Sequence, residues 1–187
     1  MEKQTPGPVA WVRMELHKVK ESLRTGISFG LTSAVITTLG LMVGLHAGTH
    51  SRLAVLGGIL TIAVADAFSD ALGIHISEES ENVHTARQIW SATIATFLTK
   101  FLFAMTFSIA VFFLPLSLAV PVNVVWGFFL LAVMSYRMAV SQGEHPVKIM
   151  GEHLFIAAVV IATSHGVGHL IASVVGTGEA GPLSSLM

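Results

Sequence analysis

The sequence contains no cysteine among its 187 residues. Disulfide bonds and thiolate metal sites are therefore excluded, and metal chemistry would have to use nine histidines and eleven carboxylates. Charged residues are also scarce, at 11% of the chain, whereas soluble domains carry about 25%. The formal net charge of −1 provides no basic surface, so we expect no nucleic-acid partner.

Apolar residues take the place of the missing charges, because 53% of the chain is hydrophobic and the mean hydropathy is +0.75. A bilayer core about 30 Å thick is crossed by roughly 20 helical residues. Five apolar runs approach or exceed that length, with polar or Gly- and Pro-containing segments between them: 27–46, 53–76, 89–113, 120–140 and 149–175. We therefore expect an all-α integral membrane protein with one five-helix transmembrane domain, 27–176, and a C-terminal tail, 177–187.

The segment before the first run, 1–26, has an amphipathic pattern. Its apolar residues recur every three or four positions, largely apart from its basic residues: Val9, Val12, Leu16, Val19 and Leu23. This pattern predicts an N-terminal amphipathic helix lying at the membrane interface, with Trp11 as an anchor in the headgroup region. The alternative is a soluble helix that caps the ends of the spans.

Lysine and arginine are concentrated on alternate segments. They precede the first run and also occur between the second and third and between the fourth and fifth runs, whereas Arg52 is alone on the other side. The positive-inside rule then predicts a cytoplasmic N-terminus and a C-terminus on the opposite side.

Small residues form a stripe along the first run, recurring every three or four positions: Gly26, Gly30, Ser33, Thr37, Gly40, Gly44 and Gly48. Such stripes let helix backbones approach closely. The stripe is consistent with packing inside one chain or with the interface of a homodimer.

Two carboxylates lie within the second run. Asp66 and Asp70 are four residues apart, so a helix places them on one face. A carboxylate at the bilayer centre costs about 2.5 to 3.5 kcal/mol on insertion scales, and such groups usually mark an ion path or pair internally. One interpretation makes both residues cation ligands or proton acceptors. The other makes them partners of Lys100, which we place at a similar depth in the third run.

Histidines supply the remaining candidates. His165 and His169 share the spacing of four, which suits a shared metal ion or a proton relay, although hydrogen-bonded packing is an alternative. We place them at the depth of Asp66. His75 precedes Glu78 and Glu81 near the cytoplasmic end of the second run, where an acidic mouth would concentrate cations and a solvated loop is the simpler interpretation.

These motifs resemble those of the vacuolar iron transporter family. The sequence Ser-Phe-Gly-Leu-Thr at 28–32 is similar to the family's Ser-Asp-Gly-Leu, and Ala-Asp-Ala-Phe-Ser-Asp-Ala-Leu-Gly at 65–73, running on to Ser-Glu at 80–81, is similar to its Ala-Gly-Ala-Ile-Ser-Met-Gly-Leu-Gly stretch. The resemblance implies a dimer of five-helix subunits that exports Fe²⁺ or Mn²⁺ from the cytosol against protons. The family's cytoplasmic metal-binding helices between spans two and three have no counterpart, because only 82–88 is available.

Two positions depart from the family pattern. The family's metal-binding aspartate falls on Phe29, and its metal-binding methionine falls on Asp70. Exchanging a soft thioether for a hard carboxylate favours harder cations such as Mn²⁺, or protons themselves.

The sequence thus predicts a membrane transporter of divalent metal cations, Mn²⁺ or Fe²⁺, with coupling to protons, a second copy of the chain as partner and no tightly bound cofactor. We expect it not to be an enzyme. Two alternatives remain open: a scaffold or interaction protein that keeps the fold without transport, and an intramembrane metalloenzyme using Asp66, Asp70, His165 and His169.

Overall fold

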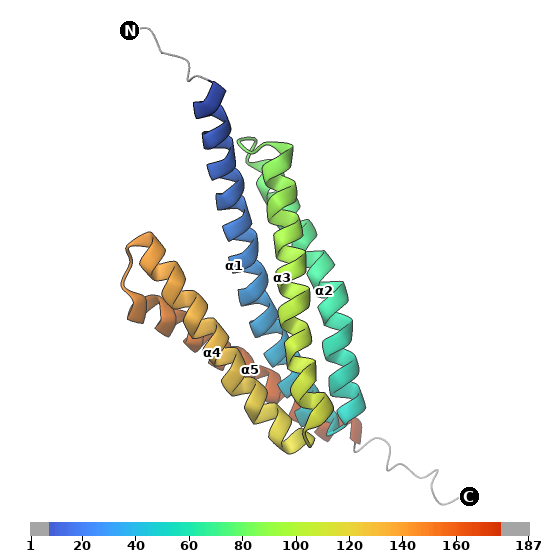
Figure 1. The fold of residues 1–187 in the computed structure, drawn as a ribbon. Coiled ribbons are helices and arrows are strands. Elements are labelled where there is room, and N and C mark those ends of the chain that lie inside the picture. The colour runs from blue at the N-terminus through green and yellow to red at the C-terminus, as the bar shows by residue number, and fades with distance from the viewer. Residues whose placement is uncertain (1–7, 177–187) are drawn as a thin grey trace, which may run out of the picture.

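The computed structural model describes residues 8–176, with side chains from 11 to 175. This part of the chain forms helices joined by short turns (Figure 1). The five helices are α1 (Pro8–Thr49), α2 (Arg52–Ser80), α3 (Ala86–Phe113), α4 (Leu116–Gln142) and α5 (Pro146–Gly176). All five are long and apolar enough to cross a membrane. The expected all-helical fold with five such helices is confirmed, and it indicates a multi-pass membrane protein. The predicted tail, 177–187, lies outside the described residues.

The first helix differs from the expectation of a separate N-terminal helix. α1 continues without a break through the expected boundary at residue 26, over 42 residues. At 1.5 Å per residue it is about 63 Å long, roughly twice the thickness of the hydrocarbon core. Ser22 and Gly26 are buried, whereas Trp11, Val12 and Leu16 are more than half exposed. The described part of the amphipathic segment, from residue 8, is therefore the first part of α1 and not a separate helix.

The helices form two groups (Figure 1). α1, α2 and α3 run side by side, whereas α4 and α5 form a pair that leans away from them, with the α4–α5 turn set apart from the start of α1. α1 contacts every other helix. The apolar core lies in its second half, where Val35, Leu39 and Met42 pack with Phe107 of α3 and Leu131 of α4. α1 is thus the central element of the fold.

The segment left between the third and fourth apolar runs, 114–119, is mostly helical in the structure. α4 begins at Leu116, with Pro115 as its N-cap, and Pro121 lies inside the helix. Pro121 has no N–H to donate to the carbonyl four residues earlier, so one intrahelical hydrogen bond is missing in the second turn of α4. The helix ends at Gly143, whose φ of 72° is in the left-handed region that glycine adopts freely.

Side chains complete several other helix ends. Ser51 caps α2 by accepting from the Ala54 N–H, and Thr85 forms a capping box with Gln88 at the start of α3. Arg52 donates from Nε to the Val111 carbonyl at 2.7 Å and from its guanidinium to the Phe112 carbonyl, which satisfies acceptors at the end of α3. The single basic residue expected on that side of the membrane therefore has a structural partner.

The small-residue stripe packs inside the chain. An added Cβ on Gly26 or Gly30 would meet α3 backbone, at 2.3 Å from the Ala92 carbonyl oxygen and 2.7 Å from that of Thr96. Further along α1, the glycines at 40, 44 and 48 face α5. Of the two interpretations, close packing of the chain's own helices accounts for these glycines.

Candidate functional site

The two intramembrane aspartates converge on one lysine. Lys100 Nζ lies 2.5 Å from Asp66 Oδ2, contacts Asp70 Oδ2, and donates to Ser33 Oγ at 2.8 Å. α2 supplies the two carboxylates, α3 the ammonium and α1 the hydroxyl. We call Asp66, Asp70, Lys100 and Ser33 the charge cluster.

Local sequence explains this convergence. The spacing of four puts Asp66 and Asp70 on one face of α2, where the buried neighbours Ala63 and Ala67 allow α3 to come close. On α1, Gly30 lies one turn before Ser33 and permits contact with the α3 backbone. Small residues thus bring together three helices whose polar side chains meet at one point.

The charge cluster is unevenly covered. The Lys100 side chain is 1% exposed, whereas Asp70 is 18% and Asp66 is 29% exposed. An open groove of about 430 Å³ lies beside Asp66, lined by Thr37, Leu41, Ile62, Ala65, Asp66 and Ser69. The ammonium is therefore enclosed by the protein, while the carboxylates can be reached from outside.

The formal charges of this cluster do not cancel. With both carboxylates ionised and Lys100 protonated, two negative charges face one positive charge, which leaves one excess negative charge in an apolar helix bundle. An uncompensated charge in such surroundings is costly, and it attracts a further cation or a proton. Chemically, the arrangement can exchange cations at carboxylate oxygens.

The histidines of α5 lie elsewhere. The His165 and His169 rings are in edge contact, with centroids 4.5 Å apart. Their neighbours Ser164 and Gly168 pack on Gly44 of α1, whereas Lys100 packs on Ser33. Ser33 and Gly44 are about 16 Å apart along α1.

The common depth of the two histidines and Asp66 stays a prediction, but the structure does not join them into one site. The cause is the packing of α5 on the far end of α1, and the leaning α4–α5 pair is visible in Figure 1. The α5 histidines and the charge cluster form two separate groups.

His75 also has its own surroundings. Its Nδ1 is 3.0 Å from Thr93 Oγ1, and its ring contacts the edge of Trp90 at a centroid distance of 4.9 Å. These contacts form part of the wall of an apolar cavity of about 400 Å³ between α2 and α3. The structure gives His75 hydrogen-bonding and aromatic partners and does not place it on the acidic residues that follow it.

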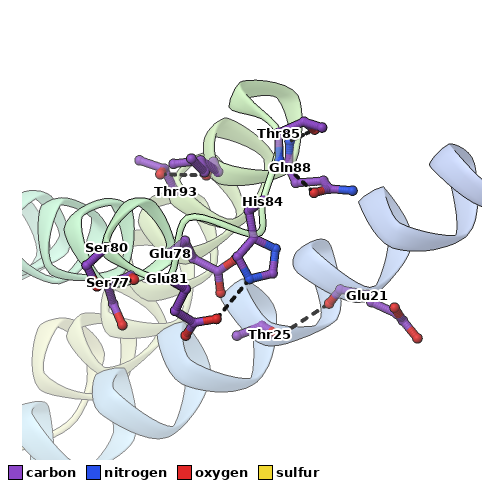
Figure 2. Close-up of polar contacts among 11 residues, drawn as sticks. Glu21, Thr25, Ser77, Glu78, Ser80, Glu81, His84, Thr85, Gln88 and Thr93 are labelled. Carbon is purple, nitrogen blue, oxygen red and sulfur yellow. Dashed lines mark hydrogen bonds and ion pairs between the residues drawn. The ribbon is translucent and has the colours of Figure 1, made fainter.

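The acidic residues at the end of α2 meet a histidine that the sequence analysis did not single out. His84 Nε2 is 3.1 Å from Glu81 Oε2 and 3.5 Å from Glu78 Oε2, and Figure 2 shows its ring turned toward both carboxylates. Glu78 is buried, whereas Glu81 is exposed. Thr85, next in the chain, donates to Glu15 of α1 at 3.1 Å. These contacts fasten the α2–α3 turn to itself and to α1.

Among residues 11–175, no three histidine or carboxylate side chains are already arranged to hold a metal ion together. The structure brings Asp66 to Asp70, His165 to His169, and Glu78 to Glu81. Sequence reasoning missed His46 and His50, which lie near the α5 pair. Their spacing of four, the same as that of His165 and His169, is the signal that could have revealed them.

The sequence matches no protein-family model, and no curated protein is significantly similar to it. The resemblance to the vacuolar iron transporter family therefore stays a prediction based on short motifs.

Proposed function

We propose that the chain is a membrane transporter of divalent metal cations, coupled to protons, and that Asp66 and Asp70 bind the cation during its passage. One observation carries this proposal: two carboxylates on one helix face share a single buried ammonium beside a groove that reaches Asp66. Intramembrane groups of this kind mark ion pathways by default. The motif resemblance to the vacuolar iron transporter family adds independent support.

The mechanism follows from charge balance. In the state that the structure describes, the Lys100 ammonium occupies the place between the carboxylates. Two carboxylates neutralise one divalent cation, so a cation that takes the place of the ammonium leaves the buried Lys100 with an uncompensated charge unless one proton departs as the cation binds. Protons compete for the same oxygen atoms, which couples the binding of the cation to the binding of protons. Relative to a thioether, hard carboxylate oxygens shift preference toward Mn²⁺.

Transport is tested by Mn²⁺ flux into proteoliposomes containing the purified chain. We expect Asp70→Asn and Asp66→Asn each to reduce the flux at least about tenfold, because each removes a charged ligand at nearly constant volume. Asp70→Met supplies a soft thioether and should shift preference from Mn²⁺ toward Fe²⁺. The control is Glu144→Gln, an exposed carboxylate in the α4–α5 turn. Unchanged flux in both Asp→Asn variants would refute the proposal.

A second candidate is a scaffold protein that does not transport ions. It is favoured by the internal pairing of both aspartates with Lys100, since a structural ion pair needs no mobile cation. The flux assay separates the two functions: a well-folded wild-type chain without Mn²⁺, Fe²⁺ or proton flux supports the scaffold. The metalloenzyme alternative gains no support from the geometry, because the charge cluster and the α5 histidines are far apart.

The proposal includes an orientation, with the N-terminus in the cytoplasm and the C-terminus across the membrane. A reporter tag fused to each end should be protected on opposite sides when intact cells are treated with a membrane-impermeant protease or label. Two tags on one side would contradict both the orientation and the odd number of spans.

Self-association also stays a prediction. Because the α1 glycines face the chain's own helices, a dimer would need another surface.

A further inference from the structure

Four histidines lie in two pairs where α1 crosses α5. His46 and His50 come from the end of α1 and the turn after it, with ring centroids 5.4 Å apart. His165 and His169 form the second pair on α5, at 4.5 Å. The His50 N–H donates to the His46 carbonyl at 3.0 Å, so the helical spacing continues to His50 and keeps both rings on one side.

Small residues on both helices bring the two pairs together. The Gly168 Cα region contacts α1 so closely that an added Cβ would lie 2.3 Å from the Gly44 carbonyl oxygen and 3.0 Å from the Gly48 nitrogen. His46 lies between these two glycines in the sequence, and His165 lies three residues before Gly168. The crossing thus assembles imidazoles from both helices.

Two further observations mark this group. His46 Nδ1 is buried and has no hydrogen-bond partner among the described residues, which is an expensive state for a polar atom. His50 has a left-handed backbone with φ of 50°, a conformation that costs of order 1–3 kcal/mol for most residues and that clusters at functional sites. A bound metal ion would give His46 Nδ1 a partner, and the backbone conformation of His50 would then hold a second imidazole at the ion.

We propose that His46, His50 and His165 bind one divalent transition-metal cation of the Zn²⁺ or Cu²⁺ class at the α1–α5 crossing, with His169 as the adjoining fourth imidazole. Neutral imidazole nitrogen suits these borderline cations, and four nitrogen atoms complete a tetrahedral or tetragonal set. No three of these side chains are already arranged around a metal ion among residues 11–175. The site therefore closes when the exposed rings of His50, His165 and His169 rotate toward the half-buried His46. The site differs in chemistry from the carboxylate pair of α2, which favours hard cations and lies beside an earlier part of α1, near Ser33 and Thr37.

Copper supplies the probe for this site. The full chain, purified with a tag that contains no histidine, is titrated with Cu²⁺ and followed by electron paramagnetic resonance. We expect one Cu²⁺ per chain with couplings from at least three imidazole nitrogens, and these couplings distinguish it from any Cu²⁺ held by the carboxylate oxygens of Asp66 and Asp70. His46→Asn and His165→Asn should each weaken Cu²⁺ binding by at least about tenfold, the loss typical even for partners outside the ligand set.

His50→Asn separates the loss of a ligand from the loss of the fold. Asparagine tolerates the left-handed backbone, so the α1–α2 turn should persist while Cu²⁺ binding weakens. The matched control is His17→Asn, an exposed histidine near the other end of α1, which should bind Cu²⁺ as the wild type does. The imidazole-coupled Cu²⁺ signal should be the same in Asp70→Asn as in the wild type, so this signal is read independently of the transport proposal.

Three outcomes would overturn the inference. They are the absence of stoichiometric Cu²⁺ binding by the wild-type chain, unaltered binding in the His50→Asn and His165→Asn variants, and an equal loss in the His17→Asn control. The last two would show that copper binds to surface histidines without a preferred site.

Discussion

Replacing Lys100 with methionine is expected to destabilise the protein by about 3–5 kcal/mol, because it removes one partner of a buried ion pair and leaves the other uncompensated. In this chain the effect is amplified, since two carboxylates are left facing the same space. Methionine has nearly the length of lysine, so the loss of stability reports the charge more than a cavity. Unfolding in detergent, followed by tryptophan fluorescence, measures the change.

The control for this substitution is Lys20→Met, which removes an exposed lysine of α1 and should change stability by less than about 0.5 kcal/mol. The decisive comparison is a triple variant in which Lys100→Met is combined with Asp66→Asn and Asp70→Asn. Neutralising all three groups should restore most of the stability, because neutral replacements for buried ion pairs are often tolerated.

The triple variant separates the effect on stability from the effect on transport. The triple variant should be folded without Mn²⁺ flux if the charge cluster is the cation path. If the single Lys100→Met variant were as stable as the wild type, the carboxylates would have to be protonated or hydrated, and the ion-pair description would fail.

The sequence predicts the number of helices well, because apolar runs near 20 residues are a direct consequence of bilayer thickness. The run 53–76, for example, lies inside α2, Arg52–Ser80. The sequence predicts the ends of helices less well than their number. Hydropathy detects contact with lipid and not helicity, so the charged first part of α1 was separated from its continuation. The fourth run, 120–140, likewise begins four residues after the start of α4 at Leu116.

The candidate site was predictable only in part. The spacing of Asp66 and Asp70 placed them on one helix face, and Lys100 could be offered as their partner from its depth alone. Nothing in the pattern gives the rotation of α3 about its axis, which decides whether Lys100 points toward α2. The separation of the α5 histidines from the charge cluster arises from the packing of α5 on Gly40, Gly44 and Gly48 of α1, which is a property of tertiary packing and has no local signature in the sequence.

The second large effect is expected from glycine at the α1–α3 contact. Gly30→Ala would place a Cβ 2.7 Å from the Thr96 carbonyl oxygen, which is backbone and cannot turn aside as a side chain would. The helices must then separate, at a cost of about 1–3 kcal/mol, as for overpacked cores. Gly30→Val should cost more. Thermal unfolding of the purified variants in detergent measures the loss.

Gly57 and Gly73 on α2 provide matched controls, because an added Cβ meets nothing within 4 Å at either position. Alanine there should be neutral or stabilising by up to about 1 kcal/mol, since alanine is the better helix former. Equal losses at Gly30 and Gly73 would show that the α1–α3 contact is not tight.

The Gly30 substitution also tests how the fold positions the charge cluster. Ser33 lies one turn beyond Gly30 and accepts from Lys100 at 2.8 Å, so separating α1 from α3 draws the hydroxyl away from the ammonium. Mn²⁺ flux in Gly30→Ala should therefore fall more than its stability alone explains, whereas Gly73→Ala should transport normally. Normal flux in a destabilised Gly30→Ala variant would show that α1 supports the fold without positioning Lys100.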